Sequence, residues 1–149
     1  MEAVLERGGV KMPLPEHVKE RLPHLRRWAN RLAGYYGCHI YLTGSALFGD
    51  NAKPRDWDIR IEMPDSDFEV RFGNVQDWVN EGGSGQWTDV RWRWSRQCVK
   101  DTKAGWYATG LNIDFQIYPK SHCRRLYAKF PKYRLDKMPK LAKAIREQE

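Results

Sequence analysis

Cysteine is scarce in this chain of 149 residues, which contains only three, at positions 38, 98 and 123. Because their number is odd and they lie far apart, they argue against a disulfide framework and do not match a zinc-site spacing. The four histidines form no ligand cluster either. No apolar run approaches the ~20 residues of a membrane-spanning helix, and the N-terminus lacks an apolar signal-peptide core. We therefore expect a soluble, cytoplasmic protein that contacts no membrane.

Charged residues are plentiful, but the excess of basic ones is confined to the end of the chain. From Lys120 onward there are ten basic residues against three acidic ones, whereas the first 119 residues contain 16 of each. Such a segment would attract nucleic acid or a nucleoside triphosphate. Lys120, Arg124 and Arg125 are candidate contacts for these ligands. The alternative is a solvated basic helix that only aids solubility.

The first long apolar pattern predicts a helix over residues 15–36. Apolar residues recur there at steps of three and four, namely Val18, Leu22, Leu25, Ala29, Leu32 and Tyr36. Pro23 interrupts the pattern, so the sequence leaves open a break or two helices. The apolar run 38–43 then predicts a strand, and the short segment 45–49 predicts a helix that follows it directly.

The stretch from Tyr41 to Ile61 is the most informative part of the sequence. Gly44 ends the apolar run and, lacking a Cβ, allows close approach of a ligand. Ser45 adds a hydroxyl beside the first free N–H groups of the next helix, which suits a phosphate. In the following strand, Asp56 and Asp58 share one face with backbones roughly 6–7 Å apart. Two such carboxylates can bind one hard divalent cation, or two that share their oxygens, and favour Mg²⁺.

This combination resembles the signature of the nucleotidyltransferase superfamily of the DNA polymerase β type. In that family a Gly-Ser, three residues and a Gly precede an Asp-x-Asp strand, and the matching residues are Gly44, Ser45, Gly49, Asp56 and Asp58. A third carboxylate arrives there from a later strand. Asp114 takes this position, within the segment 111–118, whose polar and apolar residues alternate.

The resemblance implies an α/β (α+β) fold, with a small mixed sheet and helices packed on one face. The core would span residues 1–119, and residues 120–149 would form a basic helical extension of the same domain. The implied enzyme moves a nucleoside monophosphate from an NTP to an acceptor hydroxyl and releases pyrophosphate. Asp56, Asp58 and Asp114 would hold two Mg²⁺ or Mn²⁺ ions, and Gly44 and Ser45 would bind the β- and γ-phosphates. The sequence declares neither the base nor the acceptor, which could be RNA, a protein or a small molecule.

Two other functions remain open for the same chain. It could keep the fold only to bind a nucleotide or nucleic acid through its basic tail. It could also be an interaction partner, similar to the small nucleotidyltransferase antitoxins that modify or cover a toxin. Three acids on a shared sheet face favour the enzyme, because they repel one another without cations.

The second half of the core is harder to interpret. Residues 68–80 predict one modest helix with Val75, Trp78 and Val79 inward, and 82–85 predict a flexible break. Residues 87–100 fit either a helix or a strand. We favour a strand that pairs as a hairpin with the Asp114 strand, because tryptophans alternate with arginines. Arg91 and Arg93 would then form a row able to contact a nucleic acid or substrate. A last helix is expected over 139–146.

Overall fold

The computed structural model describes residues 4–7, 10–48, 53–84, 89–126 and 132–137. Six helices lie in these ranges: α1 (Glu16–Tyr36), α2 (Ser45–Phe48), α3 (Asp65–Arg71), α4 (Val75–Ser84), α5 (Asp89–Thr109) and α6 (Lys120–Leu126). The strands are β1 (Val4–Arg7), β2 (Val10–Pro13), β3 (Ile40–Thr43), β4 (Trp57–Met63), β5 (Ile113–Pro119) and β6 (Tyr133–Arg134). No helix within these ranges is long and apolar enough to cross a membrane.

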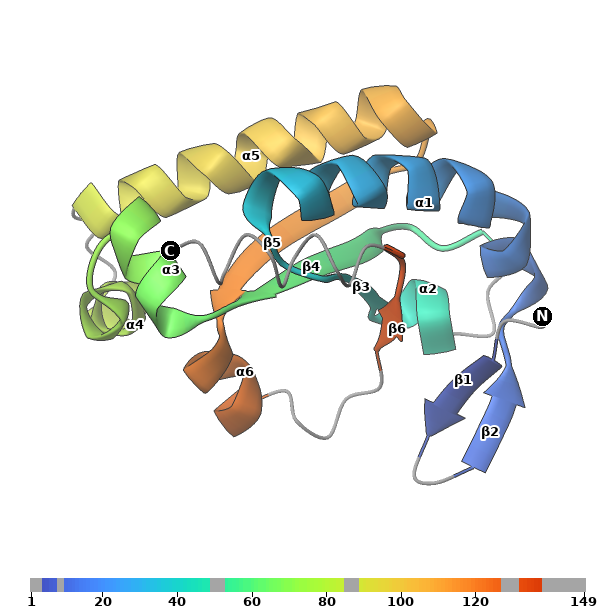
Figure 1. Ribbon diagram of the computed structural model, residues 1–149, viewed down its shortest axis with the longest axis horizontal. Helices are drawn as coiled ribbons and strands as arrows, with labels where there is room; N and C mark the ends of the chain where they lie inside the picture. Colours follow the sequence, from blue (N-terminus) through green and yellow to red (C-terminus); the bar gives the residue numbers. More distant parts are fainter. Residues whose placement is uncertain (1–3, 8–9, 49–52, 85–88, 127–131, 138–149) are drawn as a thin grey trace.

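A four-stranded mixed sheet forms the centre of the fold (Figure 1). Its strand order is β5-β4-β3-β6, with β4 and β5 parallel and the other neighbours antiparallel. Parallel neighbours need a long crossover, and α3, α4 and α5 provide it. The expected α+β architecture with a small mixed sheet is therefore confirmed. The C-terminal extension contributes α6 and then β6, which adds an edge strand beside β3.

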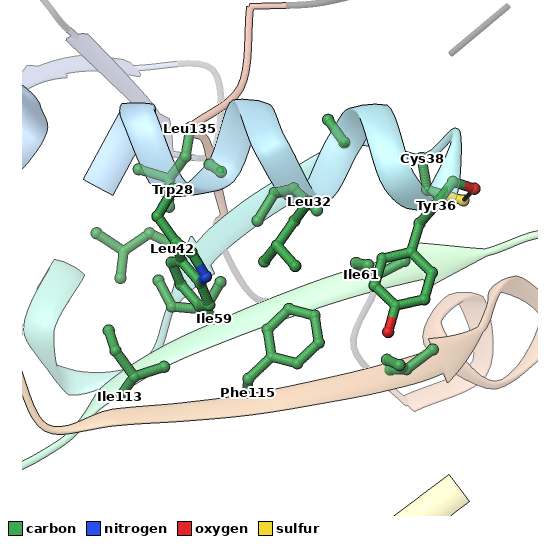
Figure 2. Close-up of a cluster of buried hydrophobic side chains, with 14 of the residues drawn as sticks. Trp28, Leu32, Tyr36, Cys38, Leu42, Ile59, Ile61, Ile113, Phe115 and Leu135 are labelled. Carbon is green, nitrogen blue, oxygen red and sulfur yellow. Dashed lines mark hydrogen bonds between the residues drawn. The ribbon is translucent and has the colours of Figure 1, made fainter. Parts of the chain in front are cut away.

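The core lies between the sheet and the helices α1 and α5. The apolar residues of β4 and β5 that face these helices are fully buried: Ile59, Ile61, Phe115 and Ile117. Figure 2 shows Trp28, Leu32 and Tyr36 of α1 directed onto this layer. Gly105 lets α5 approach closely, since a Cβ there would lie 2.7 Å from Cζ2 of Trp28. The polar residues of both strands consequently point to the other face.

Helix α1 is continuous through Pro23. The proline is exposed, so the carbonyl group that loses its helical hydrogen bond can face water. The predicted apolar stripe is buried, and Gly37 ends the helix in the left-handed conformation with φ 67°. The helix predicted over residues 15–36 is therefore confirmed as one element, without the break or the second helix that Pro23 left open.

The strand favoured for residues 87–100 is wrong, because the described part of that segment belongs to α5. The helix buries residues at steps of three and four, namely Trp94, Cys98, Asp101 and Gly105. Trp92, which the alternating pattern assigned to the core, is 56% exposed. The expected hairpin with the Asp114 strand is wrong for the same reason, since β5 pairs with β4 in parallel.

Residues 68–80 form parts of two helices rather than one. Helix α3 ends at Arg71, and Gly73, with φ 123°, turns the chain before α4 begins at Val75. Trp78 is buried, and Val75 and Val79 pack against the core as expected. The expected break at 82–85 is wrong for residues 82–84, which complete α4, while residue 85 and the predicted helix 139–146 lie outside the described residues.

Candidate active site

The sheet register brings two of the predicted acids side by side. Asp58 of β4 is paired with Asp114 of β5, and on its other side with Thr43, the last residue of β3. Neighbouring strands lie about 4.8 Å apart, and paired residues of parallel strands point to the same face. The carboxylates of Asp58 and Asp114 therefore share one surface of the sheet, opposite the core.

A cavity of about 550 Å³ opens on this surface. Its lining combines the predicted phosphate-binding residues with the paired acids: Thr43, Gly44, Ser45, Phe48, Asp58, Ile59, Arg60, Asp114, Gln116 and Tyr118. Pockets of this size hold small ligands in other proteins. Gly44, Ser45, Asp58 and Asp114, which are up to 70 positions apart in the chain, thus contribute to one concave surface.

Gly44 is required by the backbone and by its neighbour. Its φ of 77° is left-handed, and its carbonyl oxygen accepts the N–H groups of Leu47 and Phe48, which starts α2. A Cβ at this position would lie only 2.1 Å from Oδ2 of Asp58. The turn between β3 and α2 therefore lies directly against the Asp58 carboxylate. The helix after this turn is anchored as well, because His17 Nε2 of α1 donates to the carbonyl of Ala46 in α2 at 2.6 Å.

The electrostatic environment of Asp58 disfavours its charged form. Burial raises the pKa of Asp58, and the negative charges of Asp114 and Asp56 raise it further. Asp58 is therefore the acid on which the charges of the other two act. The site therefore concentrates negative charge, which a bound cation would compensate.

Amide side chains hold the other two acids. Asn112 Nδ2 donates to Oδ1 of Asp56 and to the carbonyl of Arg55, each at 2.8 Å, while Oδ1 of Asn112 accepts the indole N–H of Trp106 at 3.0 Å. Gln116 Nε2 donates to Oδ1 of Asp114 at 2.9 Å. The sequence pattern put both amides on the Asp114 face of the strand, but it did not predict these contacts.

The donor set fits a hard divalent cation only in part. Among the described residues, no group of three or more His, Cys, Asp or Glu side chains is arranged to hold a metal ion as it stands. Asp58 and Asp114 supply carboxylate oxygens in adjacent register, and burial, together with the neighbouring negative charges, raises the pKa of Asp58. Oxygen ligands of this kind suit Mg²⁺ or Mn²⁺. Asp56, which precedes β4 and is exposed, does not line the cavity, and its role as a third ligand stays a prediction.

Arg60 is a residue of the site that the sequence reading did not include. It lines the same cavity, is only 4% exposed, and its Nη2 lies 3.0 Å from Oε2 of Glu62. The signal was its position on the same strand face as Asp56 and Asp58. A buried guanidinium in the cavity supplies positive charge where the acids supply negative charge.

A second cavity, of about 690 Å³, lies between α5 and the edge strand β5. It shares Asp114 and Gln116 with the first cavity, and its rim includes Ser95, Thr102, Lys103 and Trp106 of α5. Asp114 therefore borders two cavities. Two ligands, one in each cavity, could therefore both contact the Asp114 carboxylate.

The expected row of Arg91 and Arg93 does not exist, because helix α5 turns the two side chains to different surroundings. The guanidinium of Arg91 lies over the rings of Trp78 and Trp94, and its Nε donates to the carbonyl of Trp78 at 2.6 Å. Burial lowers the pKa of Arg91. Arg91 also lines the second cavity, whereas Arg93 is exposed and borders a different one, so the contact of either with a ligand stays a prediction.

The candidate ligand contacts in the basic C-terminal segment do not line these cavities as far as their side chains are described. Lys120 begins α6, and it lines none of the cavities described above. The side chains of Arg124 and Arg125 lie outside the described residues. Their contacts with a ligand stay predictions.

A pH-dependent change in stability is expected for Asp58→Asn. The folded-state pKa of Asp58 is raised, so between the unfolded and folded values the folded chain binds more protons, and stability falls as pH rises through that interval. Asparagine removes this penalty. Without divalent cations, the variant should melt at a higher temperature than the wild type near pH 7, and the difference should shrink toward about pH 4. Thermal melts across this range measure it, and a lower melting temperature near pH 7 would contradict it.

No protein-family model, no curated protein and no solved structure matches the chain. The mixed α+β class and the geometry of the site consequently rest on this chain's own residues.

Proposed function

We propose that the protein is a metal-dependent nucleotidyltransferase, which moves a nucleoside monophosphate from an NTP to an acceptor hydroxyl and releases pyrophosphate. The observation that carries the proposal is the register pair of Asp58 and Asp114, which border one cavity with Gly44 and Ser45. These residues are separated by up to 70 positions in the chain. In the polymerase β-type superfamily that the sequence resembles, the corresponding residues are expected to lie in one site.

Transfer from an NTP requires that the negatively charged triphosphate be bound and its charge neutralised. When bound, Mg²⁺ or Mn²⁺ would supply charge neutralisation at the triphosphate and polarise the attacking hydroxyl. Asp58 and Asp114, joined by Asp56, would hold two such ions. Gly44 would donate its N–H, and Ser45 its hydroxyl, to the β- and γ-phosphates. Arg60 adds a cation to the same cavity.

The transfer itself is an in-line displacement at the α-phosphorus. The acceptor oxygen forms a new P–O bond while the bond to the bridging oxygen of the β-phosphate breaks, and pyrophosphate leaves with that electron pair. Asp114 would accept the proton of the acceptor hydroxyl. Its carboxylate is oriented by Gln116, and it faces the second cavity, from which an acceptor could approach.

An assay with labelled nucleotides tests the proposal. The purified chain is incubated with each α-labelled NTP, Mg²⁺ or Mn²⁺ and a cell extract that supplies acceptors. We expect label on a macromolecule or small molecule with one preferred NTP, together with release of pyrophosphate. The matched control is the γ-labelled form of the same NTP, whose label should appear only in pyrophosphate. Nucleotide binding without pyrophosphate release from any NTP would contradict the proposal and favour a binding-only protein.

A further inference from the structure

A third cavity, of about 450 Å³, lies between α3 and α5 and is bordered by cations. Its lining residues are Arg71, Phe72, Arg93, Arg96, Gln97 and Lys100. None of these residues is acidic, and four carry a positive charge. The proposed transfer reaction does not use this cavity, since it shares no residue with the two cavities that meet at Asp114.

The positive charge of this cluster is not cancelled by its surroundings. Within the described part of the chain, no ion pair joins Arg71, Arg93, Arg96 or Lys100 to a carboxylate. The acidic residue on this part of α5 is Asp101, which is only 7% exposed. Its carboxylate accepts the hydroxyl of Tyr36 and, at 3.1 Å, the amide of Gln97. The cavity therefore presents a positive potential to anions.

The arrangement of the cations fits a chain of phosphates better than a single one. Arg93, Arg96 and Lys100 follow one another on one side of α5 at steps of three and four residues. At a rise of 1.5 Å per residue, this row extends about 10 Å along the helix. Arg71 of α3 adds a fourth cation to the same cavity. An extended polyanion could follow this row and contact Arg71 as well.

An exposed aromatic ring beside the cluster indicates which kind of polyanion would bind there. Tyr35 is 64% exposed, and the guanidinium of Arg71 lies 5.4 Å from its ring centroid. Arg71 also lies 4.8 Å from the ring of Tyr36, which holds it in place. Proteins that bind single-stranded nucleic acids combine a cationic groove with an aromatic ring on which a base stacks.

We propose that this cationic cavity binds the phosphate backbone of a single-stranded nucleic acid, with a base stacked on Tyr35. The site is separate from the candidate active site and does not depend on the proposed transferase activity. It assigns nucleic-acid binding to the α3–α5 surface, which includes Arg93, one of the candidate contacts named from the sequence, rather than to the basic tail.

The test is the affinity of the full-length chain for a fluorescently labelled single-stranded RNA of about ten nucleotides, measured by anisotropy across a range of salt. The double variant Arg96→Gln/Lys100→Gln should weaken binding by on the order of tenfold. It should also reduce the slope of log K against log salt by about 1.4, because each phosphate contact in a single strand contributes about 0.7. Tyr35→Leu should weaken binding about fivefold or more and leave the slope unchanged, since it removes stacking and no charge.

Matched variants separate this site from general charge effects. Arg21→Gln/Arg27→Gln removes the same charge from exposed positions of α1, and Tyr107→Leu removes an aromatic ring that is 92% exposed elsewhere on α5. Both should bind RNA like the wild type. Equal losses in test and control variants, or no loss in the test variants, would overturn the proposal. Competition by inorganic tripolyphosphate with no effect of Tyr35→Leu would also overturn it, in favour of a free polyphosphate ligand.

Discussion

Replacing Asp58 with asparagine is expected to lower the rate of nucleotide transfer by on the order of 10³-fold or more. Asp58 is the acid at the centre of the site, paired with Asp114 and lying against the Gly44 turn. Asparagine keeps the shape but removes the negative charge that would hold a divalent cation. The loss of several kcal/mol of transition-state stabilisation corresponds to this rate change, at 1.36 kcal/mol for each factor of ten.

Two further variants show whether the loss of transfer is specific to the paired acids. Asp114→Asn should lose transfer to a similar degree, because it removes the other half of the register pair. Asp77→Asn, an equivalent change at an exposed position of α4, should keep the wild-type rate. The readout is the rate of pyrophosphate release at saturating NTP and Mg²⁺, with circular dichroism to confirm folding. Wild-type turnover by folded Asp58→Asn would exclude the proposed mechanism.

Replacing Phe115 with alanine is expected to lower the free energy of unfolding by about 3–5 kcal/mol. Phe115 is fully buried at the centre of the layer between the sheet and α1, and its ring packs edge-on against Trp28 at a centroid distance of 5.8 Å. Figure 2 shows the two rings among their aliphatic neighbours. Because small domains are stable by only about 5–15 kcal/mol, this loss removes a large share of the total.

Urea denaturation followed by tryptophan fluorescence measures this change. Tyr107→Ala removes an aromatic ring of similar size that is 92% exposed, and it should shift the midpoint little. If Phe115→Ala unfolds at the same urea concentration as the wild type, then the layer between α1 and β5 does not form the core. Should the variant be too unstable to purify, Phe115→Leu provides a smaller change in the same direction.

The strands of the site were predictable because each has one buried face. Strict alternation around Asp58 and Asp114 predicts two half-buried strands from local sequence alone. The buried partners of that alternation, Ile59 and Phe115, are in the core as expected. The short helix after Gly44 was also predictable, since a glycine–serine pair ends an apolar run there.

The error at α5 has a definite physical cause. Trp92 and Trp94 alternate with arginines, which is typical of a half-buried strand, but the same segment also carries a helical stripe that includes Trp94 and Cys98. The helix is stabilised because that stripe is buried against α1 and β5, whereas Trp92 is exposed. Arg91 then became a packing residue over two tryptophan rings, which a strand interpretation could not predict.

The amino-acid sequence by itself determined the two acidic strands, the glycine turn between β3 and α2, and the apolar stripe of α1, because each follows from the periodicity or backbone freedom of neighbouring residues; that α1 is continuous through Pro23 was decided by the tertiary structure. Only the tertiary structure decided that β4 and β5 run parallel, that Asp58 lies beside Asp114, and that Asn112 holds Asp56. It also brought the cations of α3 and α5 around one cavity. These features depend on contacts between distant residues, and local patterns of charge and hydrophobicity do not specify which distant segments pair.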